Sequence, residues 1–75
     1  MNSFITVTAM EWEVENDEAV VERSLVILNV DYIISISAVK HEFEQGFGIK
    51  TMISTTNKTY MVAETQEELV EKIFG

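Results

Sequence analysis

The chain has 75 residues, with 13 acidic and five basic side chains, a net charge of −8 and no cysteine. A chain of this length forms one domain, so we expect a single domain over residues 1–75. The negative charge disfavours binding to nucleic acid or to anionic membranes, and the lack of cysteine excludes disulfides, thiolate metal sites and cysteine nucleophiles.

Residues 1–4 lack the basic segment and apolar stretch of a secretory signal. The longest apolar runs, around residues 25–28 and 32–36, have the length of strands and fall far below the roughly 20 residues of a membrane span. We therefore expect a cytoplasmic protein.

Residues 4–15 alternate as a strand with one buried face does. Residues 4–7 are β-branched or aromatic, and beyond them Met10, Trp12 and Val14 alternate with glutamates. The apolar phase shifts between Val7 and Met10, so we predict a bulge or bend near residues 8–9.

Residues 15–18 have the composition of a turn, and residues 20–21 and 25–28 predict a strand that returns along the first one. A short helix over residues 17–23 is the alternative at this point. Asn29 and Asp31 favour a second turn, and residues 33–39 predict the next strand, with Ile34, Ile36 and Ala38 on one face.

Gly46 and Gly48 mark a loop over residues 45–48, where glycine permits a positive φ. Residues 49–55 and 59–62 then predict a hairpin closed around Asn57 and Lys58, because threonine-rich strands joined by an asparagine-containing turn are typical of hairpins.

The period changes at Thr65. Thr65 and Glu68 have the spacing of a capping box, and Lys72 near the helix end complements the helix dipole. The apolar stripe at helical spacing consists of Leu69, Val70, Ile73 and Phe74. These elements predict an α+β fold in which about five antiparallel strands form a curved sheet or small open barrel, with one C-terminal helix packed on it.

The sequence shows no arrangement of catalytic or cofactor-binding residues. The single histidine, His41, lies in a charged segment, and no serine has the glycine-flanked elbow of a nucleophile. Gly46 and Gly48 form a lone G-x-G, which fails the dinucleotide-binding pattern. A chain this short also spares little volume for a ligand cavity of about 300 Å³. We expect a protein that is not an enzyme and has no cofactor.

Glu11, Glu13 and Glu15 line one face of the first predicted strand, with Asp17 and Glu18 in the turn beyond. A strand displays such carboxylates about 7 Å apart and does not enclose calcium, which takes about six to eight oxygens. We expect no metal site here. The row is a solvated acidic face or a charged interaction surface.

The aromatic residues separate into two groups. Trp12, Tyr60 and Phe74 are expected in the core. Phe43 and Phe47 flank the glycine loop among charged residues, where a monomer has little reason to place them. We predict that these two are buried against a second subunit or a partner, since aromatic residues are enriched at binding hot spots.

From Leu28 onward the order of motifs is Leu-Asn-x-Asp, an isoleucine-rich strand, a hairpin, Tyr-x-Val and a capped helix. This order resembles the small flagellar accessory proteins of the FlbD/SwrD type, and similar small proteins are expected on phages and mobile elements. The matching residues are 28–36, 51–53, 60–68 and Ile73. The resemblance implies a compact, non-catalytic accessory protein that contacts a larger machine.

Two departures limit what the resemblance implies. The stretch before Leu28 is longer here and carries the acidic hairpin, and Asn57-Lys58 stands where such proteins have an Asn-Gly turn. The fold is therefore carried over and no functional residue is.

The sequence thus predicts a protein-interaction or structural module whose partner is another protein or a second copy of itself, because exposed edge strands pair readily with other chains. The alternative is an acidic decoy that occupies a nucleic-acid site on a basic protein. In that case the carboxylate row would imitate regularly spaced phosphates; it consists of Glu11, Glu13, Glu15, Asp17 and Glu18.

Overall fold

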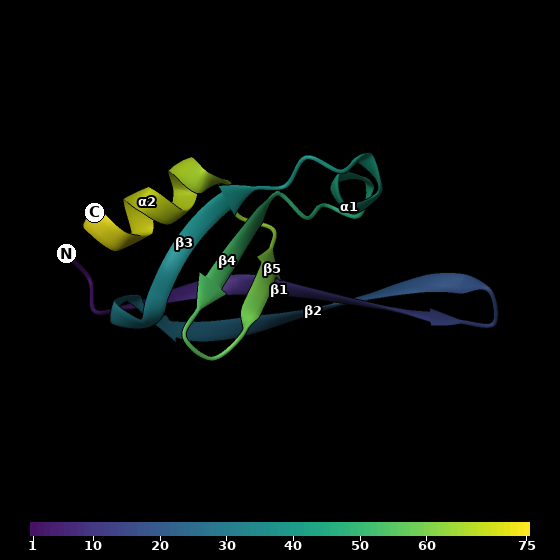
Figure 1. Cartoon of the computed structure of the whole chain (residues 1–75), viewed down its shortest axis with the longest axis horizontal. Helices are drawn as coiled ribbons and strands as arrows, with labels where there is room; N and C mark the ends of the chain where they lie inside the picture. Colours follow the sequence, from purple (N-terminus) through teal and green to yellow (C-terminus); the bar gives the residue numbers. More distant parts are fainter.

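The computed structural model describes the backbone of residues 1–75 and the side chains of residues 1–42 and 45–75. The elements are β1 (Phe4–Glu15), β2 (Glu18–Asn29), the 3-10 helix η1 (Val30–Tyr32), β3 (Ile33–Ala38), α1 (Glu42–Gly46), β4 (Thr51–Thr55), β5 (Thr59–Val62) and α2 (Gln66–Phe74). The five strands form one antiparallel sheet in the order β2-β1-β5-β4-β3 (Figure 1). The predicted α+β fold with a C-terminal helix is confirmed.

The β1–β2 hairpin keeps one register along its whole length, from Phe4 opposite Asn29 to Glu15 opposite Glu18. Asn16 and Asp17 close it with φ angles of 50° and 64°, the conformation of a two-residue hairpin turn. The predicted turn at residues 15–18 is therefore confirmed, and the alternative helix over residues 17–23 is wrong.

A bulge or bend was predicted near residues 8–9, and of these the bulge is wrong, because the β1–β2 register does not shift there. The apolar residues change from one face of β1 to the other for a different reason. Ala9 and Met10 are both buried, although consecutive side chains in a strand point to opposite faces of the sheet. The strand runs between two apolar clusters, one on each face.

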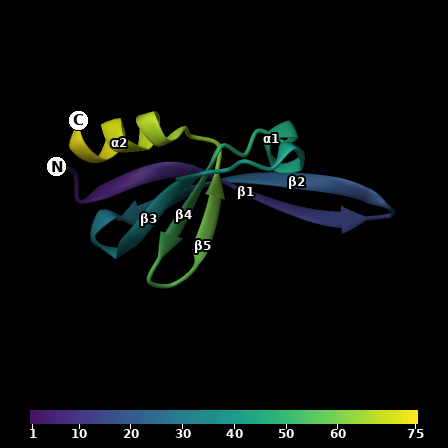
Figure 2. The same cartoon turned by 45° about the horizontal axis from the view of Figure 1, so that its top comes forward.

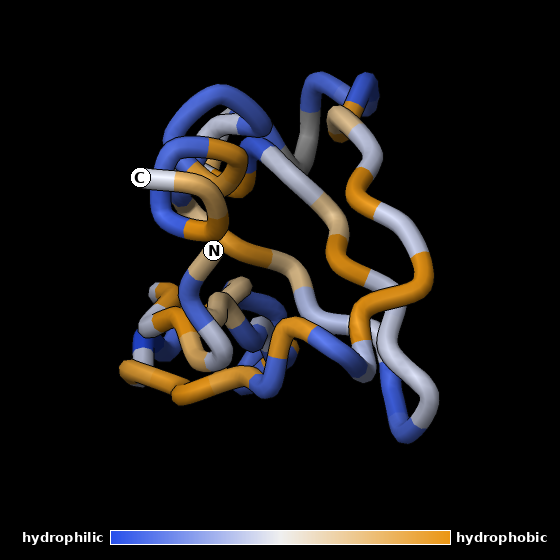
Figure 3. The backbone as a smooth tube through the Cα atoms, turned by 90° about the vertical axis from the view of Figure 1, so that its left-hand side faces the viewer, coloured by the Kyte–Doolittle hydropathy of each residue, from blue (hydrophilic) through white to orange (hydrophobic). Residues whose placement is uncertain are grey.

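The larger cluster packs α2 on one face of the sheet. Its buried members are Ile5, Val7, Leu28, Ile53, Val62, Leu69 and Ile73. The smaller cluster lies on the other face and consists of Met10, Val39 and Ile49, with Val21, Met52, Met61 and Ala63 half-buried around it. Figure 3, which looks along the long axis, shows the strands curving around one side of α2.

The segment after β3 contains a helix that overlaps the loop predicted over residues 45–48. Residues 42–46 form the short helix α1. The side-chain amide of Gln45 in this helix donates to the carbonyl of Val39 at 2.8 Å, which ties the helix to the segment after β3. The positive φ expected in this loop is confirmed at Gly48, where φ is 86°. His41 lies just before α1 and is exposed.

The prediction that Ile34, Ile36 and Ala38 lie on one face of β3 is wrong in part. The β3–β4 register shifts between Ile33 and Ser35, and Ile34 at this bulge is 69% exposed. Ile36 is half-buried against the α2-side cluster, while Ala38 is exposed. The bulge re-aims the side chain of Ile34, which simple alternation places beside Ile36.

The β4–β5 hairpin is confirmed, although β4 begins at Thr51, two residues later than predicted. The capping box of α2 is confirmed too. The hydroxyl of Thr65 accepts the backbone N–H of Glu68 at 3.1 Å, and the carboxylate of Glu68 accepts the backbone N–H of Thr65 at 3.2 Å.

The core prediction for three aromatic residues holds for one of them. Tyr60 packs half-buried against the α2-side cluster, whereas Trp12 is 43% exposed and Phe74 is 66% exposed. Within the helical stripe only Leu69 and Ile73 are buried, because a nine-residue helix lying on a sheet covers a narrow line of its surface.

The molecule is elongated, with extents of 43 × 20 × 17 Å. Most of this length comes from the β1–β2 hairpin, whose distal part projects beyond the other strands in both views (Figures 1 and 2). We call residues 10–23, which lie beyond the β1–β5 pairing at Ala9, the arm.

Candidate interaction surfaces

One face of the arm is acidic. In the β1–β2 register Glu11 lies opposite Glu22, Glu13 opposite Val20 and Glu15 opposite Glu18, so all these side chains share a face. Every one of them is exposed. The structure therefore brings together Glu11, Glu13, Glu15 and Glu18 of the predicted carboxylate row, and adds Glu22, which the sequence did not place in it. Asp17, also predicted in the row, lies in the turn.

A different part of the hairpin has an open backbone edge. The N–H of Ala63 in the segment after β5 donates to the carbonyl of Thr8 at 3.0 Å, so the backbone groups of Thr8 point toward β5. Thr8 lies opposite Leu25 in the β1–β2 ladder. Because pairs alternate along an antiparallel ladder, the backbone groups of Leu25 and Ile27 point away from β1. They point to the outer edge, since β2 is the terminal strand of the sheet.

The same stretch of β2 carries exposed apolar side chains. Leu25 is 77% exposed, Ile27 is 70% exposed, and Phe4 on β1 is 61% exposed. Leu25 and Ile27 share a face because they are two residues apart, and Phe4, opposite Asn29, is a diagonal neighbour of Ile27. No residue from 24 to 29 is charged, and none is proline. We call residues 24–29 the open edge.

The opposite edge of the sheet, β3, is protected. It has six residues against the 12 of β2, and the bulge at Ile33 and Ser35 interrupts its ladder. The side-chain amide of Gln66 donates to the carbonyl of Ile36 at 3.1 Å. Short length, bulges and covering groups are the usual means of blocking strand addition, and residues 24–29 of β2 have none of these.

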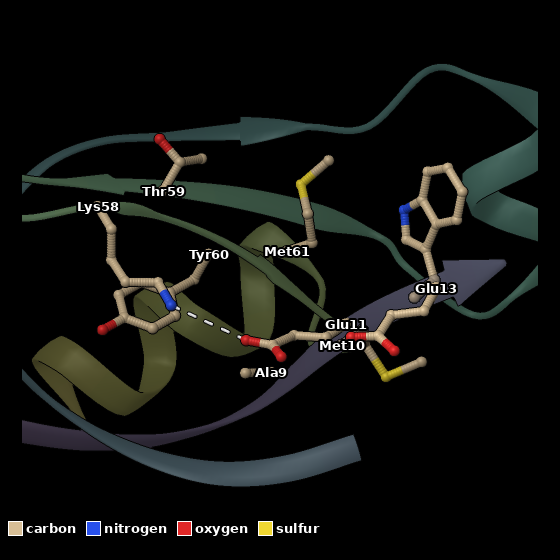
Figure 4. A pocket seen from close by; sticks show the side chains of 9 residues that line it. Ala9, Met10, Glu11, Glu13, Lys58, Thr59, Tyr60 and Met61 are labelled. Atoms are coloured by element: carbon tan, nitrogen blue, oxygen red, sulfur yellow. Dashed lines mark ion pairs between the residues drawn. The ribbon is translucent and has the colours of Figure 1, made fainter. Parts of the chain in front are cut away.

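A cleft separates β1 from β5. The two strands pair at Ala9 and Val62 and diverge beyond that point, leaving a surface cleft of about 330 Å³ that is open to solvent and lies outside the core. Its walls include Met10, Glu11 and Glu13 from β1, and Lys58, Tyr60 and Met61 from the β5 side (Figure 4).

Glu64 forms hydrogen bonds with two strands at the point where the cleft begins. Its carboxylate accepts the backbone N–H of Thr8 at 2.8 Å, and its backbone carbonyl accepts the hydroxyl of the fully buried Thr51 at 2.6 Å. The residue therefore links β1 to β4 and to the segment that leads into α2, and it holds the base of the arm.

The other two candidate residues lie near α1, away from the acidic face. Phe47 follows α1 and is half-buried. The side chain of Phe43 lies outside the described residues, so the predicted pairing of these phenylalanines with a partner stays a prediction. Among the described side chains, no three His, Asp or Glu residues gather in a group that could hold a metal ion. In the part of the chain with described side chains, no helix has the length and apolar character to cross a membrane.

Comparison with known proteins finds no family model, no curated protein and no solved structure that matches this chain. The resemblance to flagellar accessory proteins is thus untested and stays a prediction. The function proposed for this chain rests on the surfaces described above.

Proposed function

We propose that this chain is a non-catalytic protein-interaction module that self-associates through the open edge of β2. The observation that supports the proposal is the contrast between the two sheet edges. An uncharged, unbulged edge strand with exposed apolar side chains is a template for pairing with another strand, and strand addition is a common way for proteins to recognise one another.

Symmetry restricts how two copies pair through this edge. In an antiparallel pair, residues that exchange hydrogen bonds must both point their backbone groups at the shared edge, as Leu25 and Ile27 do. A two-fold axis through Val26 places Leu25 of one copy opposite the partner's Ile27, so that apolar side chains meet twice.

The same register keeps like charges apart. It places Glu22 opposite the partner's Val30 and Arg23 opposite the partner's Asn29. The carboxylates of each arm therefore stay outside the paired segment. This matters because each copy carries a net charge of −8, and like charges directly opposite one another destabilise a sheet.

The test compares two lysine substitutions at equally exposed isoleucines. Ile27→Lys places a charge on the open edge, and Ile34→Lys is its matched control on the protected edge. Light scattering on a concentration series should give a dimer mass for the wild type and for Ile34→Lys, and a monomer mass for Ile27→Lys. A monomeric wild type at every concentration, or equal dissociation of both variants, would show that the proposal is wrong.

The register has a test of its own, because the chain has no cysteine. Val26→Cys brings two thiols together on the two-fold axis, at the Cα separation of about 4.5 Å of a non-hydrogen-bonded pair, which a disulfide can span. Ser24→Cys is the control, since it faces the partner's Leu28. Oxidation should cross-link Val26→Cys and leave Ser24→Cys uncross-linked.

The acidic arm supports a second candidate function, an acidic decoy for a basic site on another protein. The observation that favours it is the placement of five glutamates on one face, two pairs of them directly opposed. Binding of this kind weakens steeply with added salt. Retention on an immobilised polylysine surface that is insensitive to Glu15→Gln combined with Glu18→Gln would exclude it.

A further inference from the structure

A positively charged group of the chain itself, the ammonium of Lys58, lies in the cleft between β1 and β5. The ammonium nitrogen of Lys58 lies 4.8 Å from the centre of the Tyr60 ring and 3.9 Å from a carboxylate oxygen of Glu11 (Figure 4). Aromatic faces and carboxylates both attract ammonium and guanidinium groups. The cleft is therefore built to receive one.

Lys58 is held weakly. Its side chain is 50% exposed and that of Glu11 is 70% exposed, and the distance between them is near the limit of an ion pair. Exposed pairs of this kind are easily broken because water and salt compete with them. An incoming cation therefore meets little resistance to replacing Lys58 on Tyr60 and Glu11.

The rest of the cleft suits a long basic side chain. Glu13 adds a second carboxylate to the wall, so the acidic groups outnumber Lys58 by two to one. The ring of Tyr60 and the side chain of Met61, both half-buried, supply apolar surface. Lysine and arginine bury their methylene stems against such surface while their charged ends stay in water.

We propose that the cleft binds a lysine or arginine side chain presented by an extended segment of a partner protein, in the place that Lys58 occupies in the free chain. The segment is extended because the cleft lies between two strands that diverge from the pair at Ala9 and Val62. Lys58 then acts as an internal competitor that swings out when the partner binds. This site is separate from the open edge of β2 and does not depend on self-association.

The test uses a synthetic peptide of alternating lysine and valine with blocked ends, and a glutamate–valine peptide of the same length as its control. Trp12, the single tryptophan, lines the cleft and reports binding through its fluorescence. The background is Ile27→Lys, so that pairing at the open edge does not contribute. We expect the lysine peptide to change the fluorescence and the glutamate peptide to leave it unchanged.

Three variants separate the cleft from general attraction to the acidic arm. Lys58→Met removes the internal competitor while keeping an apolar stem, and should raise the affinity severalfold. Glu11→Gln combined with Glu13→Gln should lower it about tenfold or more. Glu15→Gln, farther along the arm, should change it little. Unchanged or weaker binding by Lys58→Met, or an equal loss from Glu15→Gln, would overturn the proposal.

Discussion

Glu11 and Glu22 lie directly opposite each other in the β1–β2 ladder, with both carboxylates on the same exposed face. Glu15 and Glu18 repeat this arrangement beside the turn. Like charges that face each other oppose strand pairing, so β1 and β2 stay paired in the arm despite the repulsion between these carboxylates. Its stability comes from the turn at Asn16 and Asp17 and from the apolar groups on its other face.

Removing one charge of such a pair should stabilise the fold. We expect Glu22→Gln to raise the free energy of unfolding by roughly 0.2–1 kcal/mol, because it ends the repulsion with Glu11. Glu13→Gln should have a smaller effect, since Glu13 faces the uncharged Val20 and has Glu18 and Glu22 only as diagonal neighbours. Chemical unfolding at low salt measures both, and added salt should shrink the difference between them. Equal effects of the two variants would contradict this reading of the arm.

Proline substitutions should distinguish the two sides of β2. The N–H of Ile27 points to the outer edge, so Ile27→Pro should leave the fold intact and abolish self-association, since proline is tolerated on edge strands. The N–H of Val26 points toward β1, so Val26→Pro should cost about 1–3 kcal/mol through a lost ladder hydrogen bond. Thermal unfolding and light scattering measure the two effects. Loss of fold in Ile27→Pro would argue against the assigned edge.

Glu64 should control local opening at the base of the arm. Glu64→Ala removes the acceptor of the Thr8 N–H, whereas Glu64→Gln keeps an oxygen in its place. We expect the Thr8 amide to exchange with solvent faster in the alanine variant and near the wild-type rate in the glutamine variant. Hydrogen exchange followed by NMR gives both rates. No change in the alanine variant would show that the bond does not restrain β1.

The capping box should make part of the stability pH-dependent. The hydrogen bonds from Thr65 lower the pKa of Glu68 below its ordinary value of 4.5, with Lys50 and Lys72 acting in the same direction. A lowered pKa means that the folded state favours the ionised carboxylate. The contribution is therefore fully present above about pH 4.5 and is lost as the pH falls through the folded-state pKa.

Glu68→Gln tests this dependence, because glutamine keeps a hydrogen-bond acceptor and cannot ionise. The difference in free energy of unfolding between wild type and Glu68→Gln should favour the wild type at neutral pH and shrink as the solution becomes more acidic. Urea unfolding at a series of pH values measures it. A difference that stays constant through the acidic range would contradict the role of the charge.

The two faces of α2 should respond differently to truncation. Leu69 is fully buried against the sheet, and Val70 is about half exposed. Leu69→Ala should therefore destabilise the fold by about 2–5 kcal/mol, while Val70→Ala should change it by less than about 0.5 kcal/mol. Thermal unfolding of both variants provides the measurement. Similar losses would mean that Val70 is buried in solution, as in an assembly that covers this face.

Local patterns in the sequence predicted most of the elements. The turn at Asn16 and Asp17, the strand alternation on both sides of it and the capping box of Thr65 and Glu68 depend on residues close together in the chain. Their physical causes, which are backbone conformation, side-chain alternation and local hydrogen bonds, are readable from neighbouring residues. The carboxylate row at Glu11, Glu13 and Glu15 followed from the same alternation.

The features on which the proposed interactions rest depend on contacts between distant residues. The bulge that exposes Ile34 depends on the pairing of β3 with β4. The hydrogen bonds from Gln66 to Ile36 and from Thr8 to Glu64 join segments 30 or more residues apart. Sequence alone therefore determined that the chain is a small sheet with a capped helix and an acidic strand. Tertiary structure decided which edge stays open and where β1 leaves β5 to form a cleft, because strand order and strand divergence are set by packing across the whole molecule.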